Sequence, residues 1–335
     1  MALHLRRCAL LLLAAGASQI GACKSSKGAV PGLVRIGFFP NITHSQALVG
    51  NLEGTFARQL GDTKAQMIQF NAGPAAMEAL SSGSLDVSYV GTGPAIIFYL
   101  KADRQLRVIA AAADGGAVLV AKTAKTPQDL KGKKVASPQL GGTQDIALRY
   151  WLKAQGLKIA EDSKGDVTVI PLANADILGL FLTGKLEAAW VPEPWGARLI
   201  SEAGAHILLD ERDLWPNRVF HSTLLVTTKP FLEARGNDVR ALLRAHVELT
   251  RQWTEAPDGF ARRANDAFGQ LTGKALPLPV LTDAFSRLQP ALRPLPQVLS
   301  LAAKHAQELG FVPSADVGGM VDTSLLDELV RGTKP

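Results

Sequence analysis

Two stretches of this chain can be aligned with each other without a gap. The stretch from Val34 to about Gly93 matches the stretch from Val135 to about Pro194 at a constant offset of 101 residues. Identities are few, but each copy reads as strand, turn of small residues, helix, strand, helix and short strand. The repeat therefore predicts an α/β protein whose two similar lobes face each other across a cleft.

In the first copy, three expected strands end in small or polar residues just before a helix. The turns are Pro40-Asn41, Asn71-Ala72-Gly73-Pro74 and Gly91-Thr92-Gly93-Pro94. In a parallel sheet such turns lie together at the carboxyl edge, where ligands bind, and the helix N-termini offer free backbone N–H groups to an anion. The second copy supplies the opposing wall with Gly141-Gly142-Thr143 and Pro192-Glu193-Pro194.

The apolar stretch 108–120 is suited to cross from one lobe to the other, and 207–227 is expected to return. From Pro230 onward the pattern is helical, and we interpret His246 as a core-spaced helix residue and not a ligand. These expectations divide the chain into a first lobe of residues 34–118 plus 221–335 and a second lobe of residues 119–220.

The N-terminus carries a targeting segment. A basic Arg6-Arg7 pair precedes an apolar run that is too short to span a bilayer. Ile20-Gly21-Ala22-Cys23 resembles the lipobox of bacterial lipoproteins, in which the cysteine is acylated. We therefore expect a signal peptide over 1–22, lipidation of Cys23, a tether over 23–33, and an exported protein held by lipid on the periplasmic or cell-surface side of a membrane. An ordinary signal peptide or a structural cysteine is the alternative.

Composition and motifs speak against several classes of protein. The net charge of +6 is mild and spread along the 335 residues, so nucleic acid is not an expected partner. The sequence has no H-E-x-x-H, no G-x-S-x-G and no Walker motif, and its histidines lack metal-ligand spacing. We expect no catalytic residues, no cofactor and no metal, hence not an enzyme, and we expect a monomer.

Several segments together resemble a known family, the nitrate/taurine/alkanesulfonate solute-binding proteins of ABC transporters. They are Asn71 through Asp86, Gly91 to Ala95, Asp129 to Ala136, Gly141-Gly142-Thr143 and Glu193-Pro194-Trp195, and the resemblance extends from about Val34 to Val247. It implies the type II periplasmic-binding-protein fold, in which two α/β lobes joined by two crossings close on a ligand. It also implies capture of a small anionic or zwitterionic solute, such as an aliphatic sulfonate, taurine, nitrate or a sulfate ester, for delivery to an ABC permease.

Carried over by position, the resemblance implies a cleft lined from both lobes. The first lobe would contribute Asn41, Thr43, His44, Asn71, Gly73, Gly91 and Thr92, and the second Gly142, Thr143, Gln144, Glu193 and Trp195. Each of these residues also has a purely structural interpretation. The glycines could be needed only for their turns, and Asn71 and Thr43 only as helix caps. Trp195 could be a core residue, and Glu193 could be a solvated acid in a loop.

Glu193 bears on the kind of solute. A carboxylate beside an anionic head group would cost affinity unless the ligand also carries a donor or a positive charge. Taurine or an aminopyrimidine would satisfy it, so a protein that binds thiamin precursors is the alternative solute-binding function. A simple alkanesulfonate would need Glu193 turned away or paired. An enzyme resembling the thiamin-pyrimidine synthases is the alternative of another class, disfavoured by the export signal and the lack of a cysteine cluster.

Overall fold

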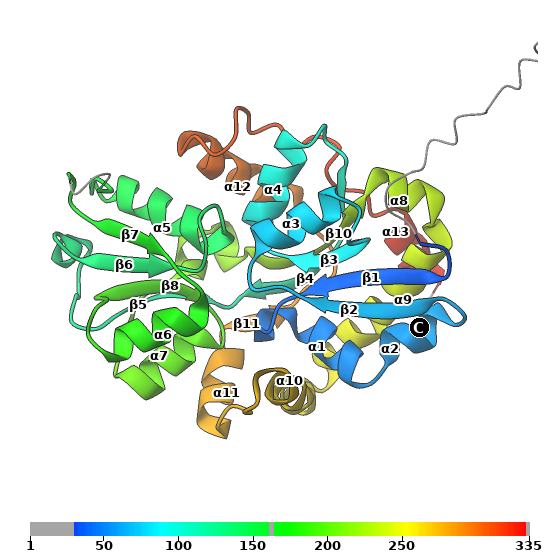
Figure 1. The fold of residues 1–335 in the computed structure, drawn as a ribbon, viewed down its shortest axis with the longest axis horizontal. Helices are drawn as coiled ribbons and strands as arrows, with labels where there is room; N and C mark the ends of the chain where they lie inside the picture. The colour runs from blue at the N-terminus through cyan, green and yellow to red at the C-terminus, as the bar shows by residue number, and fades with distance from the viewer. Residues whose placement is uncertain (1–29, 161–163, 333–335) are drawn as a thin grey trace, which may run out of the picture.

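The computed structural model describes residues 30–160 and 164–332, so the expected signal peptide, Cys23 and the tether before Val30 lie outside the described residues. Two mixed β-sheets form the centres of two lobes (Figure 1). The first sheet has the strand order β11-β4-β10-β3-β1-β2 and the second β7-β6-β8-β5-β9. The strands are β1 (Leu33–Phe38), β2 (Lys64–Gln69), β3 (Val87–Val90), β4 (Leu106–Gly115), β5 (Ala117–Ala121), β6 (Lys134–Ser137), β7 (Thr168–Pro171), β8 (Ala188–Pro192), β9 (His206–Asp210), β10 (His221–Thr228) and β11 (Leu288–Pro290).

The two sheets repeat one arrangement. In the first, β1 pairs in parallel with β2 and β3, and β10 joins β3 antiparallel. In the second, β6 pairs in parallel with β7 and β8, and β5 joins β8 antiparallel. The strands of the two sequence copies therefore occupy equivalent places, and the predicted fold of two α/β lobes is confirmed.

Helices cover both faces of each sheet (Figure 1). Apolar residues of α3, α4 and α12 pack on one face of the first sheet, and those of α1, α2, α9, α10, α11 and α13 on the other. In the second lobe α5 covers one face, and α6 with α7 the other. The helices are α1 (Ser45–Leu52), α2 (Thr55–Leu60), α3 (Gly73–Ser81), α4 (Thr92–Lys101), α5 (Thr143–Ala154), α6 (Asn174–Leu182), α7 (Trp195–Ala203), α8 (Lys229–Ala234), α9 (Gly236–Glu255), α10 (Pro257–Thr272), α11 (Leu278–Phe285), α12 (Pro296–Glu308) and α13 (Ser324–Gly332).

Two short connections join the sheets. Gly115 and Gly116, both with φ near +70°, link β4 to β5. Residues 211–220 return the chain from β9 to β10. These connections are shorter than the expected crossings, 108–120 and 207–227. Most of the apolar residues in those stretches belong instead to strands β4, β5, β9 and β10 of the two sheets. We propose the lobe boundaries at these connections, close to the expected positions after 118 and 220.

His246 is a buried helix residue, as its spacing predicts. Its Nε2 donates to the carbonyl oxygen of Ala111 at 2.8 Å, so its Nδ1 accepts from the Tyr89 hydroxyl at 3.0 Å. Burial lowers the pKa of His246 to about 4, so the ring is neutral at physiological pH. Among the described residues no helix combines the length and the apolar character needed to cross a membrane.

Candidate functional site

A cavity lies between the lobes where the strands of both sheets end. About 450 Å³ of empty space, including space open to solvent, lies within it. Every side chain in its wall is uncharged or a histidine. The lining residues are Phe39, Asn41, Thr43, His44, Asn71, Ala72, Gly73, Gly91, Pro94, Pro138, Gln139, Gly142, Thr143, Gln144, Asn174, Pro192 and Ser222.

Helix N-termini surround this cavity. Helices α3, α5 and α6 begin at lining residues, Gly73, Thr143 and Asn174, and α4 begins directly after Gly91. The residues just before these four helices make no side-chain capping bond. The first turn of a helix has unpaired N–H groups and a partial positive charge. The arrangement therefore favours a negatively charged group although no lysine or arginine lines the wall.

On the side of the first lobe, Asn41 and His44 have fixed hydrogen-bonding roles. The Oδ1 atom of Asn41 accepts from the Trp195 indole N–H at 3.0 Å, which leaves the amide NH₂ group as a donor. The Nδ1 atom of His44 accepts from the backbone N–H of Phe39 at 3.4 Å. Burial lowers the pKa of His44 to about 3, so its ring is neutral and carries its proton on Nε2. Both side chains thus keep neutral N–H donors.

On the side of the second lobe, Thr143 and Asn174 supply polar atoms. Thr143 Oγ1 accepts from the backbone N–H of Gly93 at 3.1 Å, so its hydroxyl hydrogen is free to donate elsewhere. The Oδ1 atom of Asn174 is buried and has no hydrogen-bond partner. A buried acceptor without a partner is costly, which makes Asn174 a candidate to receive a donor from a ligand.

Glycines allow the lobes to meet this closely. A Cβ atom on Gly91 would lie 2.3 Å from Thr143 Oγ1, and one on Gly93 would lie 3.0 Å from Thr143 Cα. Both distances are at or below the limit of real contacts. The glycines of the turn after β3 are therefore needed for packing as well as for the turn itself, because they leave room for the opposing helix α5.

Glu193 lies outside the cavity lining. Its side chain is fully buried and pairs with Arg287, whose Nε lies 2.6 Å from Oε1, while Oε2 accepts from the backbone N–H of Ala197 at 3.0 Å. Burial raises the pKa of Glu193 against the opposing effect of Arg287. Arg287 in turn binds Asp283 on α11 through both of its terminal nitrogens. The carboxylate is thus turned away from the cavity and neutralised.

Most of the residues predicted for the site come together around the cavity. Those that line it are Asn41, Thr43, His44, Asn71, Gly73, Gly91, Gly142, Thr143 and Gln144. Trp195 lies behind the wall, bonded to Asn41, and Thr92 donates its hydroxyl to the carbonyl oxygen of His221 and lines a neighbouring pocket. The sequence reasoning missed Phe39, Ala72, Pro94, Pro138, Gln139, Asn174, Pro192 and Ser222.

The repeat itself carries a signal for two of the missed residues. At the offset of 101, Asn174 is the equivalent of Gly73 in the other copy and Pro192 is the equivalent of Gly91. Gly73 and Gly91 were predicted for the site, and their equivalents lie at the same strand ends in the opposing lobe. Applying the offset to the predicted residues would have found Asn174 and Pro192. Ser222 lies on β10, for which the repeat holds no signal.

A resident metal site is not apparent in the part of the chain that the structure describes. No group of three or more histidine, cysteine, aspartate or glutamate side chains is arranged there to hold a metal ion. His44 is the one ionisable side chain among the lining residues.

Two α/β lobes with equivalent topology, two short crossings and a polar cavity between them define a two-lobed binding-protein fold of the type II periplasmic class. Within this class the chain belongs to the NMT1-like family, whose model matches residues 28–266.

Three comparisons illustrate the likeness. The chain is 29% identical over 202 residues to a protein of Escherichia coli (strain K12) named as an aliphatic sulfonates-binding protein, covering 58% of this chain and 60% of that protein. It is 25% identical over 225 residues to the taurine-binding periplasmic protein of the same organism, covering 65% and 66%. The structure resembles the alkanesulfonate-binding protein SsuA of Xanthomonas axonopodis pv. citri bound to MOPS, with a TM-score of 0.73, 21% identity and coverage of 88% of this chain and 99% of that chain. The chain spans less than two thirds of the length of the two Escherichia coli relatives. The similarity in fold to the Xanthomonas protein covers most of both chains.

Proposed function

We propose that this protein is a non-enzymatic solute-binding protein that captures a small anionic or zwitterionic solute between its lobes and delivers it to the permease of an ABC importer. The observation that carries the proposal is the cavity, where neutral donors and four helix N-termini converge from both lobes. Such a site binds an oxyanion through charge-assisted hydrogen bonds without a buried countercharge. The family and the named relatives for aliphatic sulfonates and taurine support the same class of solute.

The pairing of Glu193 bears on the solute. An unpaired carboxylate in the cavity would oppose a plain sulfonate. Because Arg287 lies 2.6 Å from this carboxylate and the side chain is fully buried, that objection does not apply. Aliphatic sulfonates, taurine, nitrate and sulfate esters therefore all remain within the proposed class. Uncharged aminopyrimidines form the alternative group, since amide side chains also bind neutral rings.

The experiment is a thermal-shift screen followed by calorimetric titration. A ligand raises the apparent stability by mass action, so sulfonates, sulfate esters, nitrate and pyrimidines can be compared directly. The tightest ligand is then titrated into wild type and Thr143→Ala. Loss of this hydroxyl should weaken binding by roughly ten- to a hundredfold. Recovery of a converted ligand would place the protein among enzymes, and unchanged affinity would show that the solute binds elsewhere.

For export and attachment we propose acylation of Cys23, a residue outside the described part of the chain. The lipobox-like Ile20-Gly21-Ala22-Cys23 supports this, and the periplasmic relative supports an exported location. Cys23→Ala should move the protein from the membrane fraction to the soluble fraction of cells. Mass spectrometry of the wild-type N-terminus is the direct measurement, and an unacylated terminus elsewhere would contradict the proposal.

A further inference from the structure

Helix α5 of the second lobe contacts α4 and α12 of the first lobe (Figure 1). The contacting face of α5 consists of Thr143, Ile146, Tyr150 and Lys153. These residues follow one another at intervals of three or four, which places them on one side of the helix. Thr143 begins the helix at the cavity wall, and the other three lie progressively farther from it, since a helix rises about 1.5 Å per residue. One face of α5 therefore extends from the solute site into a contact between the lobes.

The centre of this contact is an aromatic stack. The ring of Tyr150 lies nearly parallel to the ring of His305 on α12, with the centroids 3.7 Å apart and an angle of 18° between the planes. Burial lowers the pKa of His305 to about 4, so its ring is uncharged at physiological pH. Stacked rings attract each other beyond the effect of the apolar area that they bury. The stack therefore joins one residue of each lobe.

Apolar and polar contacts flank the stack. Ile146 is buried in a cluster whose other members all belong to the first lobe, among them Ala306 and Val312. Lys153, beyond the stack, donates from Nζ to the carbonyl oxygen of Glu308 at 3.1 Å. Apart from Thr143, the residues of this face do not line the cavity. These contacts thus hold the lobes together without touching a solute in the cavity.

The helix connects this contact to closure of the cavity. Thr143, in the first turn of α5, accepts from the backbone N–H of Gly93 across the cavity. Opening that breaks this bond also carries Tyr150 away from His305, because Thr143 and Tyr150 lie on one side of one helix. The stack and the burial of Ile146 then exist only in the closed form. They favour that form by a free energy that does not depend on which solute is bound.

We propose, resting on the function proposed above, that Ile146, Tyr150 and His305 form a latch that sets the solute affinity from outside the cavity. They are positioning residues, since they act through α5, whose N-terminus faces the solute. A solute bound by the closed form has a dissociation constant that rises by the factor by which the closed population falls. Loss of the latch should therefore weaken every solute by one factor, whereas loss of a cavity side chain should affect unlike solutes unequally.

The test is calorimetric titration of Tyr150→Ala and His305→Ala with taurine, ethanesulfonate and nitrate. Each variant should weaken every solute that wild type binds by the same factor, about three- to tenfold. The double variant should lose no more than either single variant, because both remove one stack. Since His305→Ala removes the stack from the other lobe, a folding defect in one variant does not decide the result.

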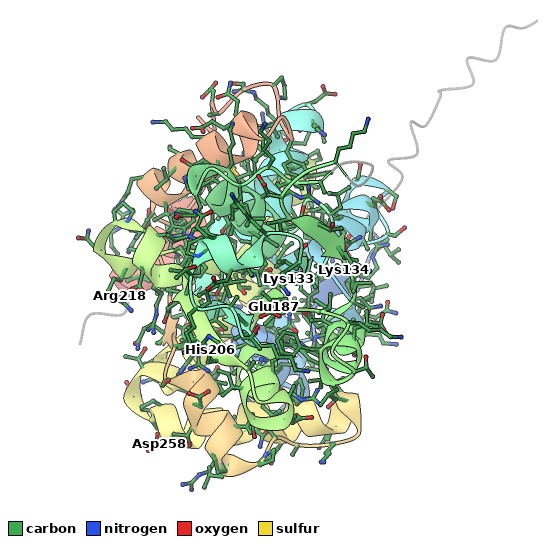
Figure 2. All side chains as sticks on the ribbon, turned by 90° about the vertical axis from the view of Figure 1, so that its left-hand side faces the viewer. Lys133, Lys134, Glu187, His206, Arg218 and Asp258 are labelled. Carbon is green, nitrogen blue, oxygen red and sulfur yellow. The ribbon has the colours of Figure 1, made fainter. Side chains whose placement is uncertain are left out.

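Two controls separate a latch from a merely structural contact. Tyr150→Phe keeps the stacked ring and should restore wild-type affinity. His206→Ala removes a histidine on the end of the second lobe that faces away from the first, where it binds only the carbonyl oxygen of Ala124, and should bind as wild type (Figure 2). Urea unfolding of the solute-free proteins should show little change in Tyr150→Ala, because the stack is absent from the open form.

Three results would overturn the latch while solute binding by wild type upheld the proposed function. They are unchanged affinity in both alanine variants, losses that differ between the solutes, and a loss of stability of the solute-free protein without a loss of affinity. Binding of none of the three solutes by wild type would overturn both proposals.

Discussion

At the scale of single residues, two buried carboxyl groups near the cleft have opposite surroundings. Glu193 has a cation, since Arg287 lies 2.6 Å away, and a backbone donor from Ala197. Glu211 accepts from the Trp190 indole through Oε2, and the Trp215 indole also acts to lower its pKa, but neither group is a cation. Burial penalises the charge on both groups, but only Glu193 has a positive partner to offset that penalty. Glu193 is therefore held as one half of an ion pair, whereas burial favours the protonated form of Glu211 at neutral pH.

Removing the cation from the buried pair should be costly. Arg287→Gln leaves Glu193 buried without a countercharge, so we expect a loss of roughly 3–5 kcal/mol in the free energy of unfolding. The double variant Arg287→Gln/Glu193→Gln should be more stable than this single variant, because the buried charge is gone. Arg240→Gln, which breaks an exposed pair with Glu328, should cost at most about 1 kcal/mol. Urea unfolding measures all three, and equal losses at Arg287 and Arg240 would refute the argument.

The free energy of unfolding should depend on pH because of the titration of Glu211. Its pKa in the folded protein, about 8, lies above the ordinary 4.5. The folded state thus holds this proton more tightly than the unfolded chain does, and the resulting stability is complete below pH 4.5 and lost as the pH rises through about 8. Between pH 4.5 and about 8, the free energy of unfolding of wild type should fall by on the order of 1.4 kcal/mol per pH unit relative to that of Glu211→Gln. Urea unfolding of both proteins across this range is the measurement, and a constant difference between them would speak against a protonated Glu211.

At the scale of elements, the cavity is built from strand ends and helix starts. Each lobe brings its parallel strands to the same edge, and the helix that follows each strand turns its N-terminus toward the other lobe. Small residues are needed at these turns for packing as well as for backbone conformation. The turn after β3 shows this most clearly, because Gly91 and Gly93 contact Thr143 of the opposing helix α5.

A methyl group on this turn should hinder closure. Gly91→Ala places Cβ 2.3 Å from Thr143 Oγ1, so the lobes must stay apart or Thr143 must move. We expect solute affinity to fall by about tenfold or more with little change in the unfolding midpoint. Gly179→Ala, on the open side of α6 where nothing lies within 4 Å of the new Cβ, is the matched control and should bind as wild type. Calorimetric titration measures the solute affinity of both variants. Wild-type affinity in Gly91→Ala would show that the lobes can close in spite of the added methyl group.

At the scale of the whole molecule, two of the contacts between the lobes bear on how they open. Two hydrogen bonds lie across the cavity, Trp195 to Asn41 and Gly93 to Thr143. The Glu193–Arg287 pair lies instead at the crossing, where Gly116 donates to the Arg287 carbonyl oxygen and accepts from the Glu193 N–H. We expect opening of the lobes to break the two hydrogen bonds across the cavity and to leave the pair at the crossing intact. We propose the crossing as the pivot of that movement.

This arrangement predicts a change of shape on binding. A solute that spans both lobes completes its hydrogen bonds only when they are closed, so it shifts the population toward the compact state. Small-angle scattering should give a lower radius of gyration with the best ligand of the screen than without it. A ligand that binds tightly without changing the scattering curve would indicate a rigid pocket.

The sequence by itself determined the two-lobed fold and much of the cavity wall. Hydrophobic periodicity and turn chemistry act over a few residues, and the internal repeat reproduces them in both lobes at one offset. Nine of the predicted residues line the cavity for this reason, from Asn41 to Gln144. Ligand binding by these residues stays a prediction, since the structure shows only where they lie.

Only the tertiary structure decided the roles of the two glutamates. Glu193 meets Arg287, a partner 94 residues away on a segment outside the repeat, so no local pattern indicated that its charge is neutralised. Glu211 follows a strand in an unremarkable Asp-Glu-Arg run, yet its side chain is fully buried and accepts from the Trp190 indole. The burial and the partner of an ionisable group depend on which distant segments pack against it, and the sequence does not contain that information in any single stretch.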